Sequence, residues 1–243
     1  MSVDVQVNDP QKAGPYSMTL PPIPPLENGD HLTRDEFERR YNAMPKTIKA
    51  ELIEGKVYMS SPVRCKSHGN PEYKIATWLG FYSAHTQGVT GANNTTVQLD
   101  EINEPQPDVL LIIDEHFGGQ TIVNADDYPE GAPELAVEVA ASSATYDLRE
   151  KKEAYRRNGV REYIVWSVYD RELQWFRLEA GQYIQLSPDD DGVVRSRMFP
   201  GLWLDVEALL KDDMAKVLAT LQQGLASSEH KDFGKRLSEV KQS

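Results

Sequence analysis

Long apolar runs are missing from this chain of 243 residues. The longest, Val109 to Ile113 and Tyr163 to Trp166, fall far short of the roughly 20 residues that a helix needs to span a bilayer. The N-terminus has neither a basic leader nor an apolar segment behind it, so we expect no secretory signal. We therefore expect a cytoplasmic protein without a membrane-spanning segment.

Cysteine is almost absent as well, because Cys65 is the single one. One cysteine cannot form an internal disulfide, and no second cysteine stands at the spacing of zinc ligands. We interpret Cys65 as a free structural thiol, since no neighbouring group marks it as reactive. Internal repeats are also lacking, and the composition, 40% hydrophobic and 26% charged, is that of a folded globular protein.

Positive charge is in short supply: 26 Lys and Arg residues stand against 38 Asp and Glu residues, for a formal net charge of -12. Because sequence-independent affinity for DNA comes mainly from cations that neutralise phosphates, this balance opposes tight binding over the whole surface. It leaves room for a local basic cleft, or for divalent ions that supply positive charge at one site. The candidate cleft residues lie in one short stretch and are Arg149, Lys151, Lys152, Arg156, Arg157 and Arg161.

The distribution of proline and of apolar residues divides the chain into three segments. Residues 1–31 are rich in proline and have few periodic apolar positions, which predicts an extended arm suited to lie over a neighbouring molecule. Residues 32–223 carry the helical and strand periodicities of a single domain. Residues 224–243 are mostly polar, and we expect them to form a C-terminal tail.

Hydrophobic periodicity and turn residues predict an α/β fold in which helices flank a sheet. The run over 109–113 is apolar without alternation, as is typical of a strand covered on both faces. Thr33 and Glu36 stand at the spacing of a capping box and begin a helix that ends near Pro45. The other predicted elements are hairpins over 50–59 and 173–186, helices over 72–85, 147–158 and 206–221, and strands over 95–99, 135–139 and 163–168.

Two acidic residues of neighbouring predicted strands are the first candidates for chemistry. Asp108 follows Pro107 at the head of one buried strand, and Glu138 lies inside the next one. A buried charge must be compensated, and two carboxylates ~4 Å apart repel each other by about 4 kcal/mol at an effective dielectric constant of 20. A bound Mg²⁺, which prefers hard oxygen ligands, would compensate both. The alternatives are a structural salt bridge from Glu138 to an arginine or a partly exposed edge position, and a turn role for Asp108.

The helix after the Glu138 strand adds a candidate cation. Asp147, Lys151 and Tyr155 recur every four residues and share one helical face. A lysine directed at the carboxylates could position an attacking water and stabilise a pentavalent phosphate. The alternative is a solvated pair of Lys151 with Asp147. His68, just before the second helix, is a candidate phosphate or metal contact, with a helix N-terminal contact as the alternative.

These motifs, taken in their order, resemble those of the bacterial putative restriction endonuclease family (Uma-type), a branch of the PD-(D/E)XK nuclease superfamily. The resemblance runs from about Thr33 to Leu210. The motifs that carry it are Glu51-Leu-Ile-Glu-Gly-Lys, Pro107-Asp108, Glu134-Leu-Ala-Val-Glu138-Val, Asp147 with Lys151 and Tyr155, and Gly159-Val-Arg-Glu-Tyr163.

The resemblance implies a restriction-endonuclease-like core, in which helices flank a mixed sheet, and a metal site. Mg²⁺, with Mn²⁺ able to replace it, would be held by Asp108, Glu138 and the carbonyl of Val139, and Glu51 would join the site. The superfamily lysine normally stands two residues after the acidic one, where this chain has Ala140. Its role would pass to Lys151 on the next helix, or to Lys152.

Three functions remain open from the sequence. The first is a Mg-dependent endonuclease that hydrolyses DNA phosphodiester bonds, with Asp108, Glu138, Lys151 and Glu51 as catalytic residues. The second is a catalytically silent nuclease-fold scaffold or protein-interaction module, which suits the net charge of -12. The third is a hydrolase of a smaller phosphate ester. We also expect a homodimer, formed through apolar side chains of the predicted edge hairpin, Trp175, Phe176 and Tyr183.

Overall fold

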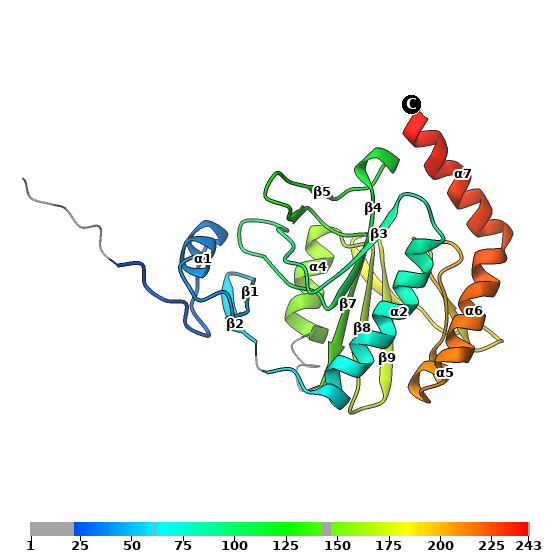
Figure 1. Ribbon diagram of the computed structural model, residues 1–243, viewed down its shortest axis with the longest axis horizontal. Helices are drawn as coiled ribbons and strands as arrows, with labels where there is room; N and C mark the ends of the chain where they lie inside the picture. The colour runs from blue at the N-terminus through cyan, green and yellow to red at the C-terminus, as the bar shows by residue number, and fades with distance from the viewer. Residues whose placement is uncertain (1–21, 61, 142–146, 243) are drawn as a thin grey trace, which may run out of the picture.

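A six-stranded sheet forms the centre of the computed structural model, which describes residues 22–60, 62–141 and 147–242 (Figure 1). The strand order is β10-β9-β8-β7-β4-β3, in which β7 and β8 are parallel and all other neighbours are antiparallel. The predicted mixed sheet is confirmed. Its strands are β3 (Val89–Asn93), β4 (Val109–Ile113), β7 (Leu135–Ala140), β8 (Glu162–Ser167), β9 (Glu172–Glu179) and β10 (Gln182–Gln185).

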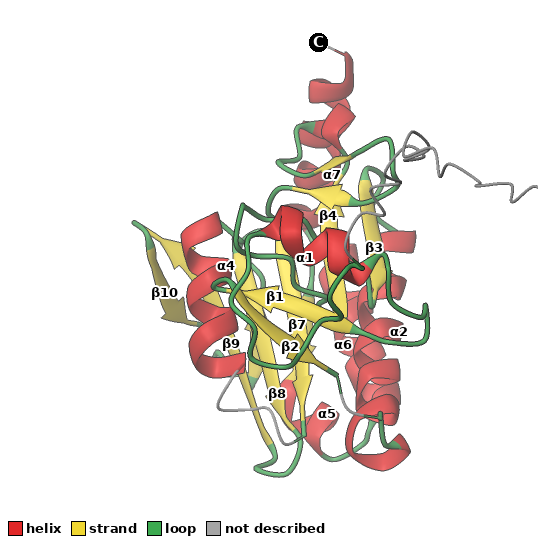
Figure 2. Cartoon of the chain, turned by 90° about the vertical axis from the view of Figure 1, so that its left-hand side faces the viewer, coloured by secondary structure: helices red, strands yellow, loops and turns green. Residues whose placement is uncertain are grey.

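Helices cover both faces of this sheet (Figures 1 and 2). The parallel pair β7–β8 needs a crossover connection, and the described part of that crossover is the π-helical turn η3 (Asp147–Lys151) followed by α4 (Lys152–Asn158). On the opposite face lie α2 (Asn70–Ala84) and α6 (Met214–Ala226). Since both faces are covered, every residue of β4, β7 and β8 is buried, which explains their apolar runs without alternation.

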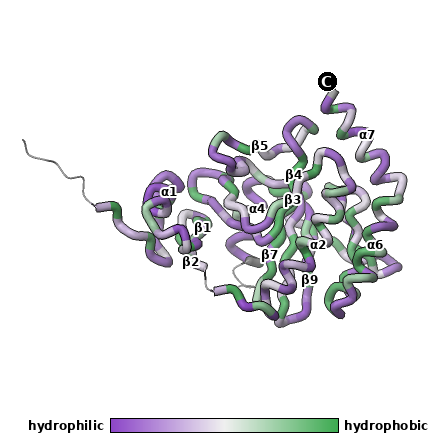
Figure 3. The backbone as a smooth tube through the Cα atoms, in the orientation of Figure 1, coloured by the Kyte–Doolittle hydropathy of each residue, from purple (hydrophilic) through white to green (hydrophobic). Residues whose placement is uncertain are grey.

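The main core lies between the sheet and α2 with α6. The apolar stripe Ile75, Trp78, Leu79 and Tyr82 of α2 is fully buried, as helical spacing predicted. Figure 3 shows that hydrophobic residues concentrate in the sheet and the inner helices. Trp78 packs edge-on against Trp175 of β9, with 5.7 Å between the ring centroids.

The aromatic residues of the β9–β10 hairpin belong to the interior, so the predicted apolar edge is wrong. Trp175 is 1% exposed and Phe176 is 4% exposed. The Tyr183 hydroxyl donates to the Val160 carbonyl at 2.9 Å. The hairpin does form at the sheet edge as expected, but its aromatic side chains point to the two helical layers. They therefore give no support to a homodimer.

The C-terminal region is helical rather than a single helix followed by a polar tail. It forms α5 (Val206–Leu210), α6 and α7 (Ser228–Gln242). Asp205 and Asp213 cap α5 and α6, because each side chain accepts a hydrogen bond from a backbone N–H of the first turn. The tail prediction failed because α7 has few apolar residues: Phe233 and Leu237 share one face and reach the core, whereas Val240 is 47% exposed. None of the described helices has the length and apolar character to cross a bilayer.

The capping box predicted for the N-terminal helix does not form. α1 (Arg34–Tyr41) begins after Thr33 but has no side-chain cap, since Glu36 pairs with Arg39 and Arg40 instead. The hairpin of β1 (Ala50–Ile53) and β2 (Lys56–Met59) is confirmed. Residues 1–21 of the predicted arm lie outside the described residues. Within the remainder of the predicted arm, Leu26 is buried against Phe37 and the hairpin.

One predicted strand is misplaced by a few residues. Residues 95–99 contain one isolated bridge, between Gln98 and Glu130, whereas β3 occupies 89–93. β3 is the edge strand and contains Gly91, so it lacks the apolar pattern of its neighbours. The remaining short elements are β5 (Ile122–Val123), β6 (Pro129–Glu130), β11 (Val193–Arg195), β12 (Trp203–Asp205) and the turns η1 (Cys65–Gly69) and η2 (Glu115–Phe117).

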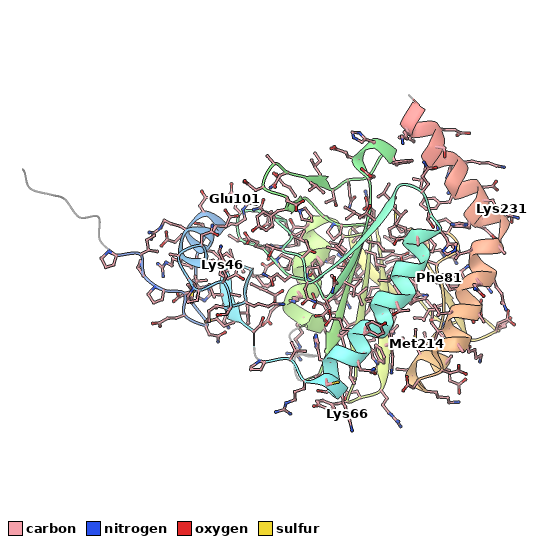
Figure 4. The ribbon with its side chains drawn as sticks, viewed as in Figure 1. Lys46, Lys66, Phe81, Glu101, Met214 and Lys231 are labelled. Carbon is pink, nitrogen blue, oxygen red and sulfur yellow. The ribbon has the colours of Figure 1, made fainter. Side chains whose placement is uncertain are left out.

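The packing of α7 can be tested with Phe233→Ala. Phe233 is 6% exposed and lies edge-on to Phe199, so its truncation leaves a cavity in the core. We expect the free energy of unfolding, measured by urea denaturation, to fall by about 3 kcal/mol. Lys231→Ala is the control, because Lys231 lies on the exposed side of the same helix (Figure 4). Equal stability of both variants and the wild type would show that α7 does not pack on the core.

Candidate active site

The two acidic candidates lie where the pairing of β4 with β7 ends. Val109 pairs with Val137 in the antiparallel register, so continuing the register by one position sets Asp108 opposite Glu138. Opposite residues of an antiparallel pair project to the same face of the sheet, with Cβ atoms about 5 Å apart. The register therefore places both carboxylates on one face, which they share with Ala136 and Ala140 beneath α4.

The backbone of Val139 faces the same point. Because β4 begins only at Val109, the Val139 N–H has no partner in that strand, and it donates to Asp108 Oδ2 at 2.6 Å. The N–H and C=O of one residue in an extended strand point to the same side, so the Val139 carbonyl faces this side as well. The pKa of His68 is raised mainly by its hydrogen bond to Asp108, and the Val139 backbone adds a small contribution.

Lys151 provides the positive charge that Glu138 requires. Its Nζ lies 3.0 Å from Glu138 Oε1 and 2.8 Å from Glu51 Oε1. The side chains of Lys151 and Glu138 are each 5% exposed, and that of Glu51 is 12% exposed. The cation beside Glu138 is thus a lysine and not the arginine of the alternative salt bridge. Lys151 is buried, so it does not lie on a solvated face. The side chain of Asp147 lies outside the described part of the chain.

Two further groups hold this carboxylate pair. The Tyr155 hydroxyl donates to Glu138 Oε1 at 2.9 Å, one helical turn beyond Lys151. Burial, together with the charge of Glu138, raises the pKa of Tyr155 well above its usual value, so the phenol remains a donor at neutral pH. The Gln106 N–H donates to Glu51 Oε1 at 2.6 Å. The β1–β2 hairpin is thereby tied to the end of the central sheet.

His68 and Lys151 both lie in π-helical turns that lead directly into α-helices. η1 carries His68 and continues as α2, and η3 carries Lys151 and continues as α4. π-helical turns are rare and recur at functional sites, because the wider turn shifts the side chains relative to a regular helix. Figure 1 shows the beginnings of both helices at the end of the sheet where β7 terminates. Figure 4 places Lys66 of η1 at that end.

His68 contacts Asp108 from the other side. Its Nε2 lies 3.1 Å from Asp108 Oδ1 and 3.5 Å from Glu72 Oε2. The hydrogen bond to Asp108 raises the pKa of His68, desolvation opposes this effect, and the charge of Glu72 adds to it. Sequence reasoning missed Glu72, although its position four residues after His68 is the spacing that puts two helical side chains on one face.

The remaining basic residues of the predicted cleft do not gather at the site. Lys152 Nζ lies 3.4 Å from the centroid of the Phe176 ring, so Lys151 is the lysine that faces the carboxylates. Arg156 pairs with Glu153 on its own helix. The others are dispersed: Arg157 pairs with Glu54, Arg161 donates to Gln120, and Arg149 is exposed.

The fold and the clustered Asp, Glu and Lys side chains define a nuclease-like α/β protein. The chain belongs to the Uma2 family, described as putative restriction endonuclease, whose profile matches residues 34–207. The fold is similar to that of a putative nuclease belonging to DUF820 from Anabaena variabilis, with a TM-score of 0.56 and 11% sequence identity. That match covers 71% of this chain and 96% of the other. No curated protein matches the chain significantly.

The role of Lys151 as a buried counterion can be tested with Lys151→Met. Removing one partner of a buried ion pair leaves an uncompensated charge, so we expect the free energy of unfolding at pH 7 to fall by about 3 kcal/mol. The double variant Lys151→Met/Glu138→Gln should recover part of this loss, because one of the two stranded charges is gone. Urea denaturation measures both effects.

Lys152→Met is the matched control for this variant. Among the described residues, the contact that its ammonium group loses is the one with the Phe176 ring, a cation–π interaction of about 1 kcal/mol. A Lys151→Met variant as stable as Lys152→Met would contradict the assigned counterion role, and so would a double variant without any recovery.

Proposed function

We propose that this protein is a metal-dependent nuclease that hydrolyses DNA phosphodiester bonds, with Mg²⁺ as its ion and Mn²⁺ able to replace it. The observation that carries this proposal is the arrangement of Asp108, Glu138 and Lys151 at one strand end. Membership of the Uma2 family and the nuclease-like fold support it. The ion would be held by Asp108, Glu138 and the carbonyl of Val139.

The residues present fit a hard divalent cation. Asp108 and Glu138 offer carboxylate oxygens on one face, and the backbone of Val139 is turned toward Asp108. Mg²⁺ favours a few carboxylates, a carbonyl and several waters over a closed protein cage. The Asp108 side chain is 11% exposed, so the site is partly open to solvent and substrate.

Each side chain of the cluster has a separate task in this proposal. When bound, Mg²⁺ acts as a Lewis acid toward the phosphate and lowers the pKa of its water ligand. Lys151 neutralises Glu138 and Glu51, and its buried ammonium group stabilises the negative charge that grows on the phosphate. Tyr155 fixes the orientation of Glu138 by its hydrogen bond. Glu51 holds Lys151 from the hairpin side.

The acidic surface shapes how DNA would be bound. With a net charge of -12 and the arginines of 149–161 dispersed, the phosphate backbone meets little fixed positive charge on α4. Binding would therefore depend mainly on the divalent ion at the site.

The rival function is a silent nuclease-fold scaffold. One observation favours it: Lys151 compensates Glu138 and Glu51 through its own ammonium group, so part of the acidic cluster is stable without an added ion. The two functions differ in a direct assay of DNA cleavage.

Cleavage of supercoiled plasmid and of single-stranded DNA, with Mg²⁺ or Mn²⁺, tests the proposal. We expect Asp108→Ala and Glu138→Gln to lower the rate at least about 100-fold, since each removes a ligand of the ion. Calorimetric titration should show weaker binding of Mg²⁺ to both variants.

Asp190→Asn is the matched control, because Asp190 is exposed in a loop outside the cluster. It should cleave at the wild-type rate. Equal cleavage by the wild type and Asp108→Ala would indicate a contaminating nuclease, and no cleavage by the wild type with either metal would favour the scaffold.

A further inference from the structure

Three side chains beside the proposed Mg²⁺ site converge in a way that the nuclease proposal does not use. One donor atom each of His68, Glu72 and Asp108 lies within 4.8 Å of the other two. Opposite ligands of a divalent transition metal are about 4.2 Å apart, since each metal–ligand bond is about 2.1 Å long. Small rotations of these side chains would bring all three donor atoms to a single ion.

The two carboxylates are already oriented for such an ion. Asp108 Oδ2 accepts the Val139 N–H, which leaves Oδ1 facing His68. Glu72 Oε1 accepts a hydrogen bond from Asn94 Nδ2 at 2.5 Å, which leaves Oε2 facing the same ring. Ligands whose second atoms are held by neighbouring hydrogen bonds keep their orientation when the metal binds.

The imidazole faces both carboxylates through one nitrogen. His68 Nε2 lies 3.1 Å from Asp108 Oδ1 and 3.5 Å from Glu72 Oε2. The side chains of His68, Glu72 and Asp108 are 22%, 14% and 11% exposed, which gives water access to complete the coordination.

Charge favours a cation at this position. Among the described side chains of the cluster, the carboxylates of Glu51, Glu72, Asp108 and Glu138 face one ammonium group and one imidazole. Negative charge is in excess even when His68 is protonated. An ion between Glu72 and Asp108 would relieve a repulsion that Lys151, bonded to Glu51 and Glu138, does not address.

From this geometry we infer that His68, Glu72 and Asp108 form a second metal site, which shares Asp108 with the proposed Mg²⁺ site and selects a divalent transition metal such as Mn²⁺ or Zn²⁺. The selectivity follows from the imidazole, because nitrogen ligands suit these metals whereas Mg²⁺ prefers oxygen. The inference deepens the proposed function by giving that site a second ion, and it rests on the proposed function only for its catalytic use.

Titration of the full chain with Mn²⁺ alone and with Mg²⁺ alone tests the site without any assay of activity. We expect His68→Ala and Glu72→Gln to weaken the binding of one Mn²⁺ at least about 10-fold, while Mg²⁺ affinity changes less than about threefold. His116→Ala is the control, since that ring is exposed outside the cluster, and it should bind both metals as the wild type does. Thermal unfolding checks that the variants fold.

Pulsed electron paramagnetic resonance of bound Mn²⁺ gives a second readout. Modulation from a ligand nitrogen should appear in the wild type, Glu72→Gln and Glu138→Gln, and should vanish in His68→Ala. Absence of this modulation in the wild type, or unchanged Mn²⁺ affinity in both site variants, would overturn the inference.

The two proposals can fail separately in these experiments. Mn²⁺ with nitrogen modulation in a wild type that cleaves no DNA would retain the second site and reject the nuclease. DNA cleavage that depends on Glu138, without any nitrogen ligand on Mn²⁺, would retain the nuclease and reject the second site.

Discussion

The early end of the β4–β7 ladder is the constraint on which the site depends. Since β4 begins at Val109, the N–H of Val139 in the buried strand β7 must find another partner, and the Asp108 carboxylate provides it. The same step of the register sets Glu138 beside Asp108. A local shortage of backbone partners thus gathers the polar groups that could bind a metal.

Burial makes the counterion of Glu138 a structural requirement as well as a chemical one. Two other buried carboxylates, Glu134 and Glu162, show the contrast, because both are held by neutral donors. Burial raises the pKa of each despite these hydrogen bonds. Glu138 instead faces the ammonium group of Lys151, shared with Glu51. A lysine in this position can serve stability and phosphate chemistry together, which relates the fold directly to the proposed activity.

The sequence pattern was most informative for elements whose apolar residues are buried along their whole length. The apolar run over 109–113 and the stripe of α2 identified their elements correctly because continuous burial leaves a continuous signal. The sequence pattern failed for the edge strand β3, which is partly exposed. It also failed for α7, of whose described residues Phe233 and Leu237 belong to the core. It also misjudged Trp175. The alternation of apolar and polar residues around Trp175 indicates a sheet face, but it does not reveal that a helix covers that face.

By itself, the sequence determined the strand that Asp108 precedes, the strand that carries Glu138 and the helical segment that carries Lys151, because local periodicity reports which face of an element is buried. The tertiary structure decided the partners: Glu51 and Glu138 meet one ammonium group, Glu72 joins His68 and Asp108, and the neighbouring arginines turn away. Except for the pair of His68 and Glu72, which are four residues apart, these contacts join segments distant in the chain. Spacing along the sequence cannot specify them, since they depend on strand register and on the π-helical turns that aim the side chains.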